Sequence, residues 1–250
     1  MDGIGTSGHK VFITGGATGI GFAIAKAFRG LGNDVLICGR RKDRLDGAAK
    51  LLPGMKTFQC DISKAEDRAR LYSFVDDSFG GVDILINNAG IQRQADFLAG
   101  EDGVKSSHEE ISTNLEAQLC VLAHFVPLLS KKGRAAIVNV SSGLGFVPLA
   151  RFPVYSATKA AMHSLTLSLR HQLKASGIDV FELIPPTVYD TELKGKPLEK
   201  TEWMSSSTDV ADALIHGMES GEQEIAVGAA KRWDRASRDD LDSMFKEINR

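Results

Sequence analysis

Short apolar runs alternate with longer helix-like patterns along almost the whole 250-residue chain. The runs are continuously apolar, which is typical of strands buried on both faces of a parallel sheet. Seven runs are expected to be strands, at 11–14, 34–39, 56–61, 83–87, 135–140, 179–184 and 224–227. Helical patterns lie between them, for example at 20–31, 42–52, 63–79 and 107–129. The alternation predicts a doubly wound α/β domain with helices on both faces and ligands at the carboxyl ends of the strands.

No repeat, low-complexity tract or Pro/Ser-rich linker interrupts this pattern, so we expect one domain over residues 1–250. The Gly-rich segment 1–9 is expected to be flexible. Residues 187–207 depart from the alternation, and we expect this segment to close over substrate and cofactor as a lid or binding loop.

The end of the chain, 235–250, is expected to form a charged helix. Its apolar stripe consists of Leu241, Met244, Phe245 and Ile248. The stripe packs either on its own domain or against a second subunit. Two earlier helices have candidate caps at their starts: Ser63, and a capping box of Ser106 with Glu109 or Ser107 with Glu110.

Composition and charge restrict the possible partners. The chain is 43% hydrophobic with a net charge of −2, so neither nucleic acid nor an acidic membrane is an expected partner. Its longest apolar run, 120–129, is too short to span a bilayer, and the start lacks the apolar region of a secretion signal. The three cysteines read as reduced thiols of a cytoplasmic protein, and the six histidines show no metal-binding spacing.

A Gly-rich turn, Thr14-Gly-Gly-Ala-Thr-Gly-Ile-Gly21, connects the first predicted strand to the first helix. Glycines allow close approach of the backbone to phosphate, and the helix N-terminus offers free N–H groups. A simple tight turn would have the same composition, but the strand–turn–helix context favours dinucleotide binding. The candidate phosphate-binding residues are Gly15, Thr18, Gly19, Ile20 and Gly21.

The end of the second strand indicates the type of dinucleotide. It ends in Cys38-Gly39-Arg40-Arg41, with no carboxylate to bind a ribose 2′-hydroxyl. Arg40 and Arg41 could instead pair with a 2′-phosphate. A solvated helix start is the alternative, although several cations are disfavoured at that position. We therefore expect NADP(H) in preference to NAD(H).

Tyr155 and Lys159 are four residues apart and share one face of a predicted helix. Neither of the other two tyrosines has a lysine at that spacing. An ordinary exposed pair is the alternative. If the ammonium lies near the phenol, we expect a lowered pKa for Tyr155, which would make it a proton donor and acceptor near neutral pH.

Five motifs in order resemble the single-domain short-chain dehydrogenase/reductase family: the Gly-rich turn, Asn-Asn-Ala-Gly at 87–90, Asn114, the Ser142 region and Tyr-Ser-Ala-Thr-Lys at 155–159. The resemblance covers about residues 10–227. It implies a Rossmann fold with a seven-stranded sheet, and hydride transfer between NAD(P) and an alcohol or carbonyl compound. It also implies a homodimer or homotetramer that pairs through the helices near 107–129 and 155–176.

By position, the family's catalytic tetrad falls on Asn114, Ser142, Tyr155 and Lys159, with Ser142 chosen over Ser141 because it precedes the tyrosine by thirteen residues. The resemblance implies that Ser142 stabilises the substrate oxygen, Lys159 holds the nicotinamide ribose and lowers the pKa of Tyr155, and Asn114 holds a water. It extends the cofactor set to Asp61, Ile62, Asn87, Asn88, Ala89, Gly90, Tyr155, Lys159, Pro185 and Val188, with Ile184 flanking the nicotinamide amide.

The loop after the sixth strand, Pro185-Pro186-Thr187-Val188, differs from the Pro-Gly of many members. With Gln92-Arg93, it resembles the subgroup related to the oxidoreductase of the teichoic-acid D-alanylation operon. Residues that could form a mixed apolar substrate pocket are Gln92, Leu144, Phe146, Phe152, Val188, Leu193 and Trp203.

The sequence therefore predicts an NADP(H)-dependent carbonyl reductase or alcohol dehydrogenase. A non-catalytic NADP(H)-binding sensor on the same fold is the alternative. A serine hydrolase is set aside because Val140 stands where the nucleophile elbow needs glycine. An epimerase or dehydratase acting on sugar nucleotides is less favoured, because those enzymes resemble longer chains with an added substrate domain.

Overall fold

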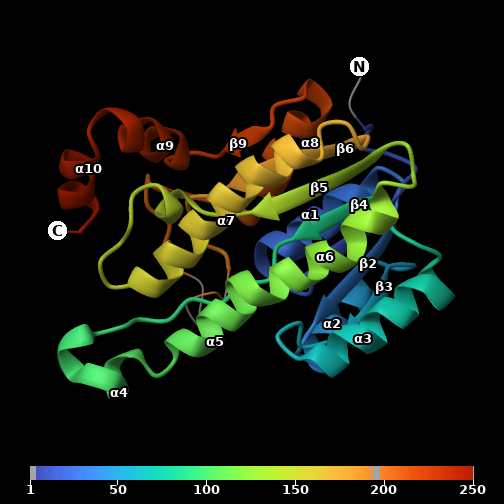
Figure 1. Cartoon of the computed structure of the whole chain (residues 1–250), viewed down its shortest axis with the longest axis horizontal. Coiled ribbons are helices and arrows are strands. Elements are labelled where there is room, and N and C mark those ends of the chain that lie inside the picture. The colour runs from blue at the N-terminus through green and yellow to red at the C-terminus, as the bar shows by residue number, and fades with distance from the viewer. Residues whose placement is uncertain (1–3, 192, 194–197, 250) are drawn as a thin grey trace.

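Seven parallel strands form the central sheet of the computed structural model, which describes residues 4–191, 193 and 198–249 (Figure 1). Their order is β3-β2-β1-β4-β5-β6-β9. The strands are β1 (Lys10–Thr14), β2 (Asp34–Gly39), β3 (Lys56–Gln59), β4 (Ile84–Asn87), β5 (Ala135–Val140), β6 (Ile178–Ile184) and β9 (Glu224–Ala226). All seven predicted strands are present, and the predicted doubly wound Rossmann fold is confirmed.

The helices fall into long packing helices and short turns. The longer ones are α1 (Gly19–Gly30), α2 (Lys42–Leu51), α3 (Ala65–Phe74), α6 (Ala117–Leu129), α7 (Pro153–Gln172), α8 (Ser207–Ser220), α9 (Ala230–Asp239) and α10 (Leu241–Ile248). The shorter ones are α4 (Gly100–Val104), α5 (Ser107–Ile111), the 3-10 turns Phe97–Ala99 and Gly143–Gly145, and the π turns Val75–Phe79 and Ser112–Glu116. No helix in the described residues could cross a membrane.

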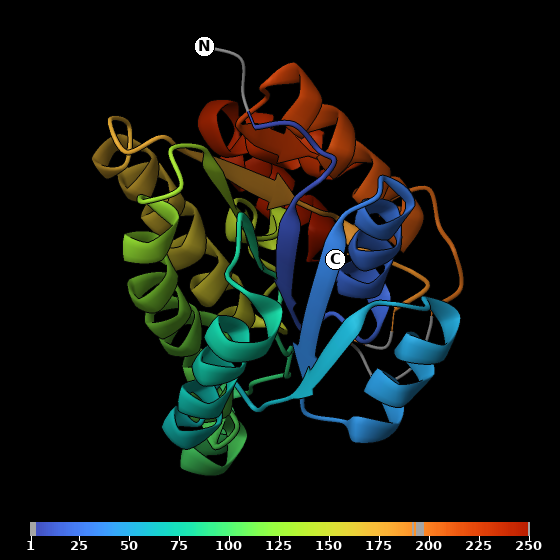
Figure 2. The same ribbon diagram turned by 90° about the vertical axis from the view of Figure 1, so that its right-hand side faces the viewer.

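Helices cover both faces of the sheet in Figure 2, and an apolar layer fills the space between helices and strands on each face. On one face α1, α2 and α8 bury residues such as Phe28, Leu45 and Leu214 against the strands. On the other face α3, α6 and α7 pack around Leu71 and Phe125. Fully covered faces explain why the strands are continuously apolar. The strand order reverses between β1 and β4, which places the ligand crevice at their carboxyl ends.

Residues 4–9 are attached to the domain, although the sequence predicts a flexible segment over 1–9. Ile4 is buried, and its N–H donates to a carboxylate oxygen of Asp179 at 3.0 Å. Thr6 Oγ1 donates to Glu219 at 2.8 Å. The segment therefore packs beside the amino end of β6 and the carboxyl end of α8.

Both predicted helix caps are wrong. Helix α3 begins at Ala65 after Lys64, and the Ser63 hydroxyl donates to Asp61 instead. Ser106 precedes α5 but makes no side-chain cap. The predicted helix over 107–129 is present: the backbone is helical throughout, with the π turn 112–116 between α5 and α6.

The predicted loop at 187–207 contains a short parallel pair, β7 (Thr187–Val188) with β8 (Met204–Ser205). Residues 192 and 194–197 of the loop lie outside the described residues. The predicted C-terminal helix is two helices, because Asp240 is extended between α9 and α10. Met244 packs on the domain itself, whereas Leu241 and Phe245 of the same stripe are exposed.

The turn after β5 is packed tightly against α9. A Cβ atom on Gly143 would lie 2.3 Å from the ring of the buried Trp233. We expect Gly143→Ala to displace Trp233 and to lower the free energy of unfolding by about 1–3 kcal/mol. Denaturant unfolding followed by tryptophan fluorescence measures the change.

Gly47→Ala is the matched control, because a Cβ there would meet no atom within 4 Å on α2. We expect it to leave stability unchanged or raise it by up to about 1 kcal/mol. Equal stability of the two variants would contradict the packing constraint at Gly143.

Candidate active site

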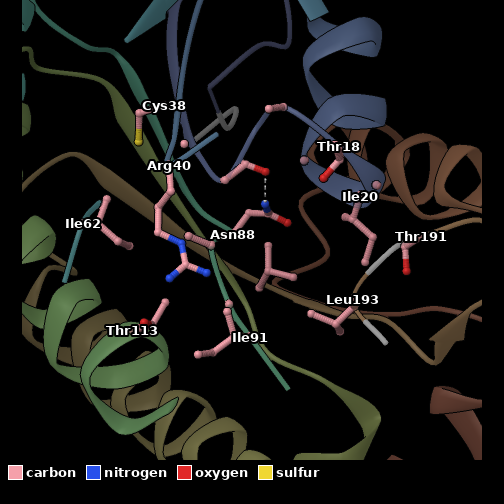
Figure 3. Close-up of a pocket in the computed structure, with 18 of the residues that line it drawn as sticks. Thr18, Ile20, Cys38, Arg40, Ile62, Asn88, Ile91, Thr113, Thr191 and Leu193 are labelled. Carbon is pink, nitrogen blue, oxygen red and sulfur yellow. Dashed lines mark hydrogen bonds between the residues drawn. The ribbon is translucent and has the colours of Figure 1, made fainter. Parts of the chain in front are cut away.

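A cavity of about 370 Å³ lies over the carboxyl ends of the central strands (Figure 3). Of the predicted cofactor residues, those that line it are Gly15, Thr18, Gly19, Ile20, Gly21, Arg40, Arg41, Asp61, Ile62, Asn88, Ala89, Gly90, Tyr155, Lys159 and Pro185. Val188 lines a smaller adjoining cavity instead. The predicted cofactor residues therefore gather around one cavity.

The Gly-rich turn is fixed to the end of β4 by Thr14 and Asn88. Thr14 Oγ1 accepts hydrogen bonds from the N–H groups of Asn88 and Ala89, both at 3.0 Å. The Asn88 amide donates to the carbonyls of Thr14 at 2.9 Å and Gly15 at 3.1 Å, the latter drawn as a dashed line in Figure 3. These bonds fix the position of the Gly-rich turn relative to the end of β4.

Two glycines shape a cradle in this turn. Gly15 has a φ of 65°, and a Cβ on Gly21 would lie 2.5 Å from the Asn88 amide nitrogen and from the Gly15 carbonyl. Side chains at these two positions would clash with the Asn88 region, so glycine lets the turn pack closely there. Beside them lies the N-terminus of α1, where helix N–H groups attract phosphate. The first turn of α1 contains no acidic residue. The cradle thus fits the pyrophosphate of a dinucleotide.

Arginines stand at the other end of the cavity, where β2 ends. Arg40 reaches across it (Figure 3), with Nη1 3.1 Å from an oxygen of Glu109 and 4.0 Å from an oxygen of Asp61. Arg41 donates to Thr18 Oγ1 at 3.4 Å. Two guanidinium groups near the cavity can bind an additional phosphate.

Tyr155, on α7, lies between the two cavities and lines both of them. Ser142 follows β5 and lines the smaller cavity with Tyr155. Its Oγ accepts a hydrogen bond from the N–H of Leu144 at 3.1 Å. A phenol and a hydroxyl therefore share the wall of the smaller cavity where it adjoins the larger one.

The environment of Tyr155 differs from the expected one. Burial raises the pKa of Tyr155 to about 12, while a hydrogen bond with Ser142 lowers it and the charge of Glu110 raises it. The expected lowering by Lys159 is absent from these causes. Lys159 Nζ donates to the Val140 carbonyl at 2.7 Å and lies 5.7 Å from the centroid of the Tyr155 ring. The prediction of a lowered tyrosine pKa is therefore wrong for this arrangement.

Lys159 is itself strongly affected by its surroundings. Burial lowers the pKa of Lys159 to about 8, and the charge of Glu182 raises it. Lys159 is only 4% exposed to solvent. Strongly perturbed groups that face a cavity are typical of functional sites.

Asn114 lies in the π turn between α5 and α6. Its Oδ1 accepts from the N–H of Ile91, and its amide donates to the Ile91 carbonyl, both at 2.8 Å. The amide also donates to Thr158 Oγ1 at 3.2 Å, which ties the β4 loop to α7. π turns are frequent at functional sites because they re-aim single side chains. Asn114 thus has a defined positioning contact; the predicted water stays a prediction.

Two predicted cofactor residues face elsewhere. Asn87 points into the core, where it donates to Asn139 at 3.0 Å. Ile184 belongs to the buried cluster around Trp233. The reason is the alternation of strand side chains, which turns Asn87 and Asn88 to opposite sides.

Of the predicted substrate-pocket residues, the smaller cavity includes Gln92, Leu144, Val188 and Leu193. Phe146 packs on His163, Phe152 is in the buried cluster with Tyr155, and Trp203 lies over Arg232. Lining residues that the sequence did not assign to the site include Thr113, Thr191 and Leu198. Arg93 and Thr187 also line the cavities, but the sequence marked them only as parts of subgroup motifs. No set of three metal-binding side chains occurs in the described residues.

Comparison with known proteins identifies the family of the chain. The short chain dehydrogenase family matches residues 9–202. The chain therefore belongs to the short-chain dehydrogenase family and is an NAD(P)-dependent oxidoreductase.

Individual relatives narrow the classification of the chain within this family. The oxidoreductase DltE of Bacillus subtilis is 41% identical over 244 residues, covering 96% of each chain. The predicted resemblance to that subgroup is confirmed. A short-chain dehydrogenase from Burkholderia cenocepacia, solved with NADP, is 27% identical with a TM-score of 0.83, covering 98% of this chain and 99% of the other. One from Burkholderia phymatum, solved with NAD, shares the fold at 21% identity and a TM-score of 0.83, covering 96% of each chain.

The buried ammonium of Lys159 predicts a pH dependence of stability. The pKa of Lys159 is about 8 when folded, against 10.5 as its ordinary value, so the unfolded chain binds more protons between these pH values. Below pH 8 both states are protonated and the cost of burial is fully present. Stability from this group therefore rises as pH increases above about 8.

We expect the free energy of unfolding of the wild type, minus that of Lys159→Met, to rise by on the order of 1–3 kcal/mol between pH 8 and pH 10. Urea unfolding of both proteins across this range measures the difference, in which other titrating groups cancel. A difference that stays flat with pH would show that Lys159 titrates normally.

Proposed function

We propose that the protein is an NADP(H)-dependent oxidoreductase that interconverts a carbonyl compound and the corresponding secondary alcohol. The observation that carries the proposal is the position of Tyr155. It is buried, adjoins Ser142, and lies between the dinucleotide cradle and the smaller cavity. A substrate in the smaller cavity would have its oxygen beside two hydroxyl groups and its carbon toward the cofactor.

In the reduction direction, the bound cofactor supplies hydride to the carbonyl carbon. The Ser142 hydroxyl donates a hydrogen bond to the oxygen on which negative charge develops. Tyr155 donates its phenolic proton to the same oxygen, which completes the alcohol. Because burial keeps the pKa of Tyr155 at about 12, the phenol is protonated at neutral pH and ready to donate. We propose that Lys159, whose ammonium lies 5.7 Å from the centroid of the Tyr155 ring in the lining of the larger cavity, holds the ribose of the cofactor.

The smaller cavity is the proposed substrate site. Its side chains are mainly apolar, and Gln92 supplies an amide next to the two hydroxyls. We propose that the segment 187–207 closes over it, since Val188 and Leu198 of that segment already line the cavity. Limited proteolysis should cut between residues 195 and 207 more slowly when NADPH is present.

NADP(H) is the proposed preference over NAD(H). It is supported by Arg40 and Arg41 at the end of β2, where the strand offers no carboxylate for a ribose.

We further propose a cytoplasmic homodimer or homotetramer. The pairing of subunits is supported by the exposed Ile111, Leu119 and Leu167 on α5, α6 and α7. Sedimentation of the intact chain tests the assembly.

A non-catalytic NADP(H) sensor would need the cradle but no proton donor. The shared position of Tyr155 and Ser142 at the smaller cavity favours the enzyme, because binding a dinucleotide does not require a pair of hydroxyls there. A panel of carbonyl compounds followed by NADPH absorbance decides between the two.

We expect Tyr155→Phe to lower kcat for carbonyl reduction by at least about 100-fold, because the proton donor is removed. NADPH affinity should stay within about threefold. Tyr72→Phe is the matched control, since burial also raises the pKa of Tyr72 to about 12 but its hydroxyl donates to Cys120 outside the site. Near wild-type turnover in Tyr155→Phe would overturn the assigned role.

We expect Arg40→Gln to raise KM for NADPH by about tenfold, because one charge-assisted contact to the 2′-phosphate is lost. KM for NADH should change by less than about twofold. Arg44→Gln, on α2 outside the described cavity lining, is the control and should change neither value. Equal changes for both cofactors in Arg40→Gln would contradict the NADP(H) preference.

A further inference from the structure

A buried carboxylate lies behind the proposed catalytic residues. Glu182, on β6, is 0% exposed. One of its oxygens accepts a hydrogen bond from Ser141 Oγ at 2.5 Å, and the other lies 2.8 Å from Nδ1 of His163 on α7. A charge at this depth is costly unless it is paired and hydrogen-bonded, and both of its oxygens are held. The proposed reaction uses neither Glu182 nor His163.

Two features of the fold bring Glu182 close to Lys159. Lys159 and His163 are four residues apart on α7, so they occupy one helix face on adjacent turns. Lys159 also donates to the carbonyl of Val140, which pairs in the sheet with Leu183, the neighbour of Glu182. The charge of Glu182 accordingly raises the pKa of Lys159 against the lowering caused by burial.

We propose that Glu182 is a positioning residue of the active site: its carboxylate keeps Lys159 in the ammonium form and, through Ser141, holds the chain that carries Ser142. The inference rests on the proposed function, because it concerns the charge of Lys159 during that reaction. The arrangement is not a nucleophilic triad, since Ser141 donates to the carboxylate and not to the histidine.

His163 shares the same carboxylate from the outer side. Its side chain is 23% exposed, and Phe146 packs on its ring. The hydrogen bond and charge of Glu182 raise the pKa of His163, burial lowers it, and the charges of Glu224 on β9 and Asp234 on α9 also raise it.

The two outer acids already have arginine partners. Arg170 pairs with Glu224 at 3.2 Å, and Arg238 pairs with Asp234 at 2.9 Å and with Glu224 at 3.6 Å. Glu182 is thus the carboxylate that attracts both His163 and Lys159. When His163 loses its proton, its positive charge no longer offsets the attraction between Glu182 and the Lys159 ammonium.

The test is the pH profile of kcat/KM for NADPH-dependent carbonyl reduction. Glu182→Gln keeps the size of the side chain and an acceptor for Ser141 but removes the charge. We expect its alkaline limit to move down by about one pH unit or more, with activity recovering at lower pH. Glu182→Asp, which restores the charge, should return most of the shift. An unchanged alkaline limit in a folded Glu182→Gln protein overturns the proposal.

Glu224→Gln is the matched control. It removes a carboxylate from the neighbouring strand at the residue that pairs with Glu182 in the sheet. Glu224 is not among the charges that act on Lys159. We expect its alkaline limit to equal that of the wild type. A downward shift as large as that of Glu182→Gln would show a general charge effect and overturn the assignment.

His163→Gln keeps the proposal testable if Glu182→Gln does not fold. Glutamine can still donate to Glu182 but carries no charge, so the field of the carboxylate on Lys159 is undiminished. We expect the alkaline limit to stay at the wild-type pH or to rise. A fall in His163→Gln overturns the proposal, because loss of structure alone would then explain both variants.

An NMR titration of the protein labelled with ε-¹³C-lysine separates this inference from the proposed function, with Lys159→Met assigning the resonance. A lower Lys159 pKa in Glu182→Gln, with no carbonyl turnover in the wild type, supports the electrostatic role of Glu182 and overturns the proposed function. Wild-type turnover with an identical Lys159 titration in both proteins overturns the inference alone.

Discussion

The hydrogen bonds between Thr14 and the Asn88 region are the constraint on which the site depends. They join the ends of β1 and β4 at the point where the strand order reverses. Because the amide of Asn88 binds carbonyls inside the Gly-rich turn, the height of that turn and the direction of α1 are set from the neighbouring strand. The chain that continues from Asn88 reaches Ile91, whose N–H donates to Asn114 and whose carbonyl accepts from it. The Gly-rich turn and α7, which carries Tyr155, are thus both positioned by one short stretch of backbone.

The site contains groups that an optimally stable core would exclude. Lys159 and Glu182 are charged side chains at nearly complete burial, and Tyr155 is a phenol whose ionised form is disfavoured there. Natural proteins commonly accept such destabilising groups where chemistry requires them. Here the cost is contained by Ser141, His163 and the Val140 carbonyl, which satisfy the polar atoms of the two charges. Stability and reactivity are therefore set by the same few contacts.

Sequence reasoning was accurate where local physics dominates. Continuous apolar runs gave the seven strands, because strands covered on both faces must be apolar along their whole length. The turn motif located the cavity, because glycine positions depend on local backbone geometry. It failed where the outcome depends on tertiary contacts. Ser63 and Ser106 are of a residue type that commonly caps helices. The hydroxyl of Ser63 instead donates to Asp61, and Ser106 makes no side-chain cap on α5, which the π turn 112–116 follows.

The electrostatics of Tyr155 and Lys159 could not be obtained from spacing. Helical spacing puts both residues on one face, but the depth of burial and the competing carbonyl of Val140 determine the direction of the pKa shift. The role of Glu182 had one visible sign, a charged residue inside the apolar run Phe181-Glu182-Leu183. Only the register of β5 against β6 reveals what lies beside it.

The packing of Trp233 on Gly143 has a consequence for how the molecule is made. The turn that presents Ser142 is synthesised well before α9, yet α9 supplies the wall against which that turn rests. A growing chain can pair β1 with β2 early, since those strands are close in sequence. The turn that carries Ser142, in contrast, lacks its packing partner until residues beyond Trp233 have emerged. The nascent enzyme therefore passes through a stage in which its dinucleotide-binding half can form while its chemistry cannot begin.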